Sequence, residues 1–359
     1  MKICFTGNVF SFGPDMAYGG ERILYYLAKG LADAGHEVHV FAREGCDLSD
    51  TNVMSYTPVG PLQGDRDVHF EAVAKFIKDT GIKFDVYQCN YFGDGWNPSI
   101  LNEFNYCELT WCVWTHMGHQ LRMKPYNTLS YSKVMHQDFL DIGMDTSIIY
   151  YGIPKDLYSF SPDHDEYAVW IGKIEGGKEP HLAIKLAKAA GLKIVIMGPP
   201  YNTGCFWDQV APYIDNETVF WVRGVDDAMK QKIMSRAKVF ISSNGNTWKE
   251  HFGIVNAESL AMGTPILAFN RIGQECAIKV DNIIEDGKQG FFLNYNDSND
   301  VEEILDKGLP LLNKIATIDR MECRKQFERR FTSDIMVSRY ERFYEAIQGG
   351  ERIYSMDLT

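Results

Sequence analysis

Residues 249–269 read KEHFGIVNAESLAMGTPILAF, and the two glutamates of this stretch, Glu250 and Glu258, stand eight positions apart. The segment between Gly253 and Gly263 has apolar residues at helical spacing, which predicts a helix bounded by the two glycines. Glu250 then precedes the helix, and Glu258 lies on its second turn, roughly 7 Å further along at about 1.5 Å per residue. The predicted buried stripe of this helix comprises Ile254, Ala257, Leu260 and Ala261. The stretch therefore places one carboxylate before a helix and one on it.

The start of this helix offers hydrogen-bond donors. The backbone N–H groups of Phe252, Gly253 and Ile254 have no partner within the helix, and they and the helix dipole favour an anion or an electron-rich oxygen. Carboxylates accept hydrogen bonds from ring hydroxyls, so Glu250 and Glu258 suit a sugar at one end and a ribose at the other, with phosphates between them. Taken alone, two glutamates at this spacing are more often solvated surface residues.

The wider segment TWKEHFGIVNAESLAMGTPILA resembles the E-x7-E signature of the family 4 glycosyltransferases, in which a glutamate and an aromatic-glycine pair precede a helix with the second glutamate, followed by Gly-Thr-Pro and a strand. The resemblance extends over roughly residues 2–347 and is weakest between residues 43 and 110. It implies an α/β chain with the GT-B fold, two Rossmann-like domains facing an interdomain cleft. It also implies retaining sugar transfer from a nucleoside diphosphate sugar, with Glu250 at the transferred sugar and Glu258 at the ribose.

The first half of the chain alternates predicted strands and helices, which favours a parallel sheet. Residues 2–42 read as a strand, an amphipathic helix and a second strand, and Gly19 and Gly20 stand at the start of that helix. Paired glycines let a backbone approach a phosphate closely, and the resemblance places such a pair against the donor. The predicted strand ELTWCVWTH ends at His116, where ligands gather in parallel sheets and where the family has a histidine near the donor sugar.

Proline and acidic residues at 159–166 predict a domain boundary. We expect an acceptor-side domain over residues 1–160, to which a helix at about 333–347 crosses back, and a nucleotide-sugar domain over residues 161–332. The segment 286–294 is expected to form a hairpin-like turn, and residues 322–348 to form two helices, the second capped by Thr332 or Ser333.

The loop after the strand YAVWI begins at Gly172 and contains three glycines and two lysines, Lys173 and Lys178, which predicts a clamp for a diphosphate. The family usually has arginine where this chain has Lys173, and glycine where it has Glu179. Lysine cannot make the two-pronged contact of arginine, so Lys178 is the stronger candidate of the two lysines. The resemblance also places the backbone of residues 223–225 against the nucleobase.

The composition limits the partners. The chain has 36 basic and 48 acidic residues and a formal net charge of −12, which argues against binding to nucleic-acid backbones or anionic lipid. Eight scattered cysteines without a C-x2-C pair are typical of a reduced, cytoplasmic protein, and neither a secretion signal nor a run of eighteen apolar residues is visible. The acidic residues of GDRD, Asp65 and Asp67, and those of residues 163–165 read as solvated loop charges, so we expect no metal site.

The sequence therefore predicts a metal-independent transferase without a further cofactor. Its donor is expected to be a UDP- or GDP-linked sugar, and its acceptor a sugar, a lipid-linked molecule or a small molecule. Three alternatives stay open: a nucleotide-sugar epimerase or phosphorylase of the same fold, a transferase acting on a modified nucleic-acid base, and a non-catalytic two-lobed sugar-binding protein. Product analysis separates the first from a transferase, and salt-sensitive DNA binding marks the second.

Overall fold

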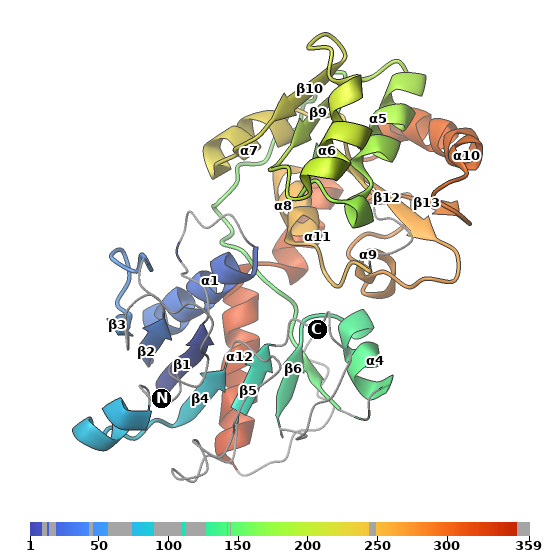
Figure 1. Cartoon of the computed structure of the whole chain (residues 1–359). Helices are drawn as coiled ribbons and strands as arrows, with labels where there is room; N and C mark the ends of the chain where they lie inside the picture. The colour runs from blue at the N-terminus through green and yellow to red at the C-terminus, as the bar shows by residue number, and fades with distance from the viewer. Residues whose placement is uncertain are drawn as a thin grey trace. The chain divides into compact units, whose positions relative to one another are not determined.

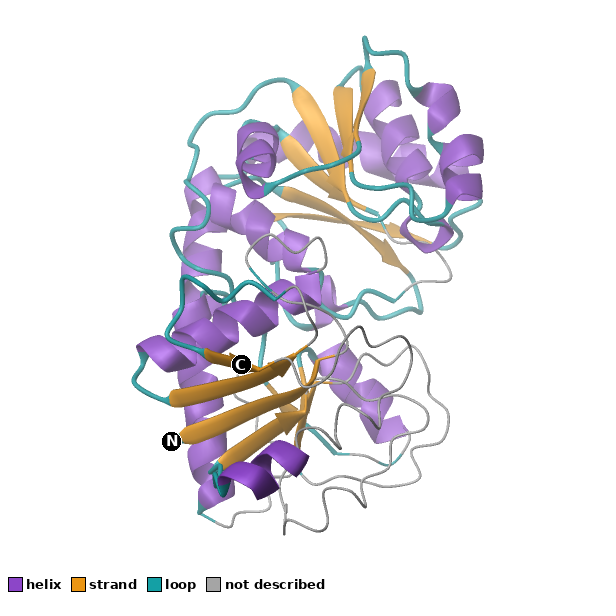
Figure 2. Cartoon of the chain, turned by 60° about the vertical axis from the view of Figure 1, so that its left-hand side comes forward, coloured by secondary structure: helices purple, strands orange, loops and turns teal. Residues whose placement is uncertain are grey.

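The computed structural model describes residues 1–8, 13, 19–42, 46–56, 74–89, 109–112, 127–141, 143, 145–243 and 249–349. The chain divides into two compact units: unit 1 comprises Met1–Pro154 and Thr332–Thr359, and unit 2 comprises Lys155–Phe331. The first division falls after Pro154 rather than after residue 160 as expected from the sequence. Each unit contains one sheet with helices packed against it (Figure 1; Figure 2).

Unit 1 is built on a parallel sheet of seven strands in the order β3-β2-β1-β4-β5-β6-β7. The strands are β1 (Lys2–Asn8), β2 (Glu37–Ala42), β3 (Met54–Tyr56), β4 (Val86–Cys89), β5 (Leu109–Cys112), β6 (Thr128–Ser130) and β7 (Ser147–Ile148). Its helices include α1 (Gly19–Asp33), α4 (Lys133–Asp141) and α12 (Ser333–Gln348). The β1-α1-β2 unit confirms the strand, helix and strand predicted over residues 2–42.

Helix α12 reaches unit 1 from the end of the chain. It begins after Thr332, whose hydroxyl accepts a hydrogen bond from the amide of Ile335 and so acts as the cap. Helix α12 packs on α1, where Val337 lies against Gly30. The ring of His36, just beyond α1, lies 2.8 Å from the carboxylate of Glu341. These contacts join the last helix to the first βαβ unit.

Unit 2 is built on a parallel sheet of six strands in the order β10-β9-β8-β11-β12-β13. The strands are β8 (Tyr167–Ile171), β9 (Lys193–Met197), β10 (Val219–Val222), β11 (Val239–Ser242), β12 (Ile266–Arg271) and β13 (Gly290–Tyr295). The helices are α5 (Pro180–Ala189), α6 (Thr203–Gln209), α7 (Asp227–Met234), α8 (Ile254–Met262), α9 (Ala277–Val280), α10 (Val301–Lys314) and α11 (Arg320–Arg330). Helices α5 and α10 pack together, as do α8 and α11, so the sheet is buried between helical layers (Figure 1).

Two features of unit 2 differ from the sequence predictions. The segment 286–294 is not hairpin-like, because β13 pairs with β12 in parallel along its whole length. Helix α10 was not predicted, although Asp300 caps it through the amide of Glu303, and Ile304 and Leu312 are buried in the core. The predicted helix between Gly253 and Gly263 is confirmed as α8, whose two flanking glycines both have left-handed backbone conformations.

Candidate functional site

The carboxyl ends of the parallel strands of unit 2 share one edge of the sheet. Strand β8 has β9 on one side and β11 on the other, so the direction of the strand order changes between β8 and β11. In open α/β sheets ligands bind outside the carboxyl ends of the strands at such a switch point. The loop after β8 carries Lys173 and Lys178, and the loop after β11 carries Glu250. The topology thus brings these predicted site residues together at the carboxyl ends of β8 and β11.

Lys178 and Glu250 form an ion pair across the switch point. Each side chain is 18% exposed. Burial tends to raise the pKa of Glu250, but the charge and hydrogen bond of Lys178 outweigh it, helped by His251 and the amide of Phe252, and the net pKa lies below the usual value of 4.5. Glu250 is therefore ionised at neutral pH.

Two side chains, Ser243 and Trp170, hold the backbone of Lys178 in place. Its carbonyl accepts a hydrogen bond of 2.8 Å from the hydroxyl of Ser243, which lies just after β11. The same hydroxyl accepts a bond of 2.9 Å from the indole of Trp170 on β8. Because Trp170 and Ser243 are buried, these bonds hold the lysine loop rigidly against the sheet.

The residue after Lys178 has an unusual conformation. Glu179 has φ 43° and ψ 53°, the left-handed region that glycine adopts without strain, and it directly precedes Pro180 at the start of α5. Its carboxylate accepts a hydrogen bond of 2.9 Å from the hydroxyl of Ser298, in the turn after β13. A side chain is thus retained at a backbone position that favours glycine, and it ties the lysine loop to a second loop.

The start of α8 lies beside this ion pair. Gly253 has φ 71°, and a Cβ there would collide with the side-chain amide of Asn256 and crowd Glu250. The amide of Phe252, one of the three donors expected at the helix start, donates to the carboxylate of Glu250. The ring of Phe252 is buried and packs edge-on against Phe331, with ring centroids 5.7 Å apart. Glu250 is held close to the helix start through this amide.

Glu258 is buried rather than solvated. Helix α8 is buried on all sides from Asn256 to Met262, so the predicted four-residue stripe was too narrow, and its first member, Ile254, is only partly buried. The carboxylate of Glu258 lies 2.7 Å from the ammonium of Lys230 and 3.1 Å from the hydroxyl of Tyr158. Asp227 completes this group, since its carboxylate lies 3.4 Å from Lys230 and accepts a hydrogen bond from Tyr158. The sequence analysis missed Tyr158, Asp227 and Lys230, for which the only signal was an acidic-basic pair one helical turn apart.

The remaining predicted residues are placed as follows. The ammonium of Lys173 lies over the ring of Tyr201, 4.7 Å from its centroid, rather than in the ion pair. Gly19 and Gly20 are half-buried at the first turn of α1 in unit 1. His116, Asp65 and Asp67 lie outside the described residues.

The acidic residues of the loop 163–165 were expected to be solvated charges rather than metal ligands. Asp165 is exposed and pairs with Arg236 at 2.8 Å, and this hydrogen bond lowers the pKa of its carboxyl group. Within the parts of the chain that the structure describes, no three His, Cys, Asp or Glu residues form a group that could hold a metal ion.

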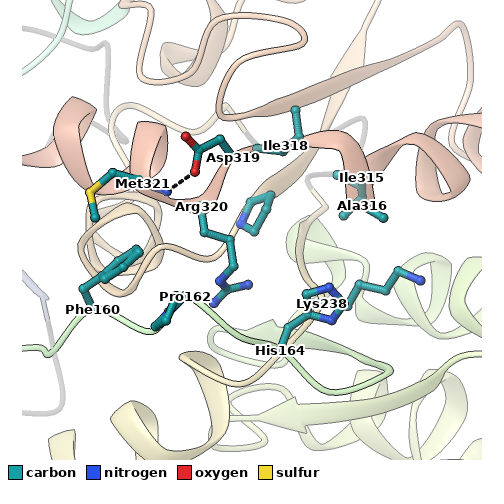
Figure 3. Close-up of a pocket in the computed structure, with 11 residues that line it drawn as sticks. Phe160, Pro162, His164, Lys238, Ile315, Ala316, Ile318, Asp319, Arg320 and Met321 are labelled. Atoms are coloured by element: carbon teal, nitrogen blue, oxygen red, sulfur yellow. Dashed lines mark hydrogen bonds between the residues drawn. The ribbon is translucent and has the colours of Figure 1, made fainter.

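A hollow of about 370 Å³ lies at the opposite edge of the unit 2 sheet (Figure 3). Lys238 and Pro265, which line it, directly precede β11 and β12 and so mark the amino ends of the strands. The guanidinium of Arg320 beside it is bound by the backbone carbonyls of Ser161, Ser235 and Ala237. The cations there serve the fold, and the switch point remains the better candidate for a site.

Two family models match the chain, one mainly in each unit. Residues 158–315 match the glycosyl transferases group 1, and residues 17–100 match the glycosyltransferase family 4. Both of the matching models describe glycosyltransferases. The switch-point residues from Lys173 to Glu258 all fall within the first match.

Solved structures share the fold of this chain over its length. A glycosyltransferase from Rickettsia africae ESF-5 superposes with a TM-score of 0.72 at 16% identity, covering 98% of this chain and 99% of that one. Sucrose-phosphate synthase from Thermosynechococcus elongatus superposes with a TM-score of 0.71 at 18% identity, covering 98% and 100%. The predicted GT-B fold class is therefore confirmed.

Among curated proteins, the chain is similar to an alpha-1,3/1,6-mannosyltransferase, alg-2, from Neurospora crassa. The two are 29% identical over 208 residues, which is 56% of this chain and 41% of the relative, so the chain aligns with about two fifths of that protein. Of the helices described in the two units, none has the length and apolar character needed to cross a bilayer.

Proposed function

We propose that the chain transfers a sugar from a nucleoside diphosphate sugar to a hydroxyl acceptor, with retention of anomeric configuration and without a metal ion. The observation that carries the proposal is the ion pair of Lys178 and Glu250 at the start of α8. A cation, an ionised carboxylate and a helix amino terminus at one switch point offer the charges that a sugar diphosphate needs. The cation and the helix end suit the diphosphate, and the carboxylate suits the sugar hydroxyls.

In this proposal, the first step of donor binding is a new contact between Lys178, which is paired with Glu250, and the diphosphate. The diphosphate approaches Lys178, whose ammonium can donate to a phosphate oxygen while it remains close to Glu250. Lys173 supplies a second cation, held over the ring of Tyr201. The amides of Gly253 and Ile254 face the same phosphates, and Glu258 receives the ribose hydroxyls.

The chemical step then breaks the bond between the anomeric carbon and the diphosphate oxygen. The acceptor oxygen attacks from the face that the diphosphate leaves, and its proton passes to the departing phosphate oxygen. Negative charge that develops on the diphosphate is stabilised by Lys178 and the α8 amino terminus, and positive charge on the sugar ring is stabilised by Glu250. The same proposal keeps the roles that the family resemblance implies for Gly19 and Gly20 in donor binding and for His116 in the reaction.

The donor base and sugar follow less directly from these residues. Residues 223–225 follow β10 at the same sheet edge and would meet the base through their backbone, which is compatible with uracil or guanine. The printed activity of the Neurospora relative makes a mannosyl donor the first to test. The acceptor is proposed to be a sugar, a lipid-linked molecule or another small molecule with a free hydroxyl.

The test is product analysis with the full chain. UDP- and GDP-linked sugars are incubated with a panel of sugar and lipid-linked acceptors in EDTA, and the anomeric configuration of each product is assigned by NMR. The proposal expects a product with the configuration of the donor, and a Glu250→Gln variant that forms it far more slowly. An inverted product overturns the mechanism, and a sugar nucleotide that is epimerised or phosphorolysed overturns the transferase.

A further inference from the structure

We infer that Lys230 is a positioning residue that, together with Tyr158, orients Glu258 toward the donor ribose and makes nucleotide recognition depend on the ribose hydroxyls. The inference rests on the proposed function and extends it to residues for which sequence reasoning gave no role. It concerns a buried group of four side chains, Tyr158, Asp227, Lys230 and Glu258, which we call the ribose network.

The geometry of the ribose network fixes one oxygen of Glu258. Lys230 donates to Oε1 of Glu258 at 2.7 Å, and the hydroxyl of Tyr158 lies 3.1 Å from the same oxygen. Lys230 also donates to the Tyr158 hydroxyl at 2.9 Å, and its ammonium lies 5.4 Å from the centroid of the tyrosine ring. The side chains of Lys230 and Glu258 are only 8% and 4% exposed. The donating ammonium, with the tyrosine hydroxyl beside the same oxygen, restricts the orientation of the carboxylate plane.

Stability alone does not account for this arrangement. Removing a lysine and a glutamate from water costs several kcal/mol per ion, and well-packed apolar residues in place of such a pair are often as stable or more stable. The pair is buried, since its side chains are 8% and 4% exposed and Tyr158, which contacts both, is 1% exposed. A charged pair retained in such a place is better explained by a use for the carboxylate than by a gain in folding energy.

The position of the ribose network within unit 2 indicates which part of the donor it meets. Lys230 lies on α7, which begins just after β10 and residues 223–225, where the base is proposed to bind. Glu258 lies on α8, whose start carries Glu250 and the proposed diphosphate site. Helices α7 and α8 lie against each other. In a nucleoside diphosphate the ribose joins the base to the phosphates, so a bridge between these two helices falls where the ribose must lie.

The experiment compares ribose discrimination among variants of the full chain. Calorimetric titrations with UDP and GDP, and with their 2′-deoxy and 3′-deoxy forms, give the ratio of deoxy to ribo dissociation constants. Wild type is expected to show a ratio of at least about tenfold, the effect of a hydrogen bond to a charged acceptor. Lys230→Met and Glu258→Gln are both expected to reduce this ratio to about threefold or less, and Lys230→Arg to restore part of it.

Matched variants separate positioning from a merely structural role. Tyr158→Phe removes the hydroxyl that lies beside Glu258 and Lys230 but keeps the ring, and it is expected to lower the ratio partially. Lys238→Met removes another lysine of unit 2 that contacts a glutamate at 2.7 Å, Glu166, at the amino ends of the strands. This control is expected to leave the ratio unchanged. The double variant Lys230→Met/Glu258→Gln should discriminate no worse than Glu258→Gln alone, because Lys230 acts through Glu258.

The outcomes distinguish the inference from the function on which it rests. Full discrimination in Lys230→Met, with loss in Glu258→Gln, overturns the role of Lys230 and leaves the proposed function standing. Full discrimination in Glu258→Gln overturns the ribose assignment itself. Failure of wild type to bind either nucleotide overturns the proposed function. If Lys230→Met does not fold, an unchanged ratio in both Lys230→Arg and Tyr158→Phe overturns the inference.

Discussion

Substitution of Lys178 by methionine tests whether Glu250 depends on this one cation. Methionine keeps most of the length and apolar stem of lysine but removes the charge and the hydrogen bond to Glu250. Glu250 would retain the influence of His251 and the amide of Phe252, and burial, the largest influence on its pKa, would no longer be opposed by the charge and hydrogen bond of Lys178. We therefore expect the pKa of Glu250 to rise above its usual value of 4.5 in the variant.

The cost of the substitution follows from the exposure of the pair. Removing one partner of a fully buried ion pair costs about 3 to 5 kcal/mol, whereas an exposed pair contributes about 0 to 1 kcal/mol. Both side chains here are 18% exposed, which places the pair between these limits. We expect a loss of about 2 kcal/mol of unfolding free energy at pH 7, equivalent to a fall in Tm of roughly 4 to 8 °C for a domain of this size.

The sign of the pH dependence is specific to this account. In wild type the folded pKa of Glu250 is lowered, so its contribution to stability is present above pH 4.5 and is lost as the pH falls through the folded pKa. In the variant the folded pKa is raised, so stability is retained below pH 4.5 and lost as the pH rises through the new value. The difference between the two proteins should therefore be small near pH 4 and largest near pH 7.

The assay is urea unfolding of both proteins at pH 4, 5.5 and 7, with Lys188→Met as the control. Lys188 lies 3.8 Å from Asp215 in an exposed pair, with side chains 43% and 39% exposed, so its loss should cost about 0.5 kcal/mol or less at every pH. A destabilisation by Lys178→Met that is equal at pH 4 and pH 7 would refute the coupling to Glu250. The same variant should bind UDP and GDP more weakly, and unchanged affinity would remove Lys178 from the site.

Three further predictions follow from the same residues. Activity should survive exhaustive chelation, and loss of turnover with EDTA that magnesium or manganese restores would contradict the metal-free mechanism. Glu250→Gln should mainly lower kcat, by about 2 to 4 kcal/mol of transition-state stabilisation, whereas Glu258→Gln should mainly raise the donor KM; steady-state kinetics showing the reverse would exchange the two roles. Glu179→Gly should be more stable to urea than Glu179→Ala by about 1 kcal/mol, because both lose the Ser298 bond and glycine relieves the left-handed strain. Lys185 lies inside α5 and serves as the control, because there Lys185→Ala should be more stable than Lys185→Gly. If the alanine variant is the more stable one at Glu179 as well, the left-handed strain at Glu179 is refuted.

Local signals were sufficient to predict much of the fold. The helix between Gly253 and Gly263 follows from apolar spacing and two glycines, and the structure confirms both ends. The segment 286–294 was misjudged because its turn residues are local, whereas the parallel partner of β13 is β12, which is set by long-range packing. Helix α10 contains Pro310, which interrupts an otherwise regular helical pattern and weakens its signal.

Candidate site residues that lie in loops directly after strands could be predicted from the sequence. Candidate site residues that are marked only by their burial could not. Lys178 and Glu250 could each be assigned to a strand end, and the switch-point topology brings them together. Asp227 and Lys230, three positions apart on a helix, read from sequence as an ordinary surface pair. Only the packing of α7 against α8 reveals that Lys230 is buried against Glu258.

The central claim is that a nucleoside diphosphate sugar binds at Lys178 and Glu250. The most direct measurement is thermal unfolding of wild type and Lys178→Met with a panel of UDP- and GDP-linked sugars. The account predicts that at least one donor stabilises wild type by about 2.7 kcal/mol at 100 times its dissociation constant, and that the same concentration stabilises Lys178→Met much less. Stabilisation by none of the donors, or equal stabilisation of both proteins, would contradict it.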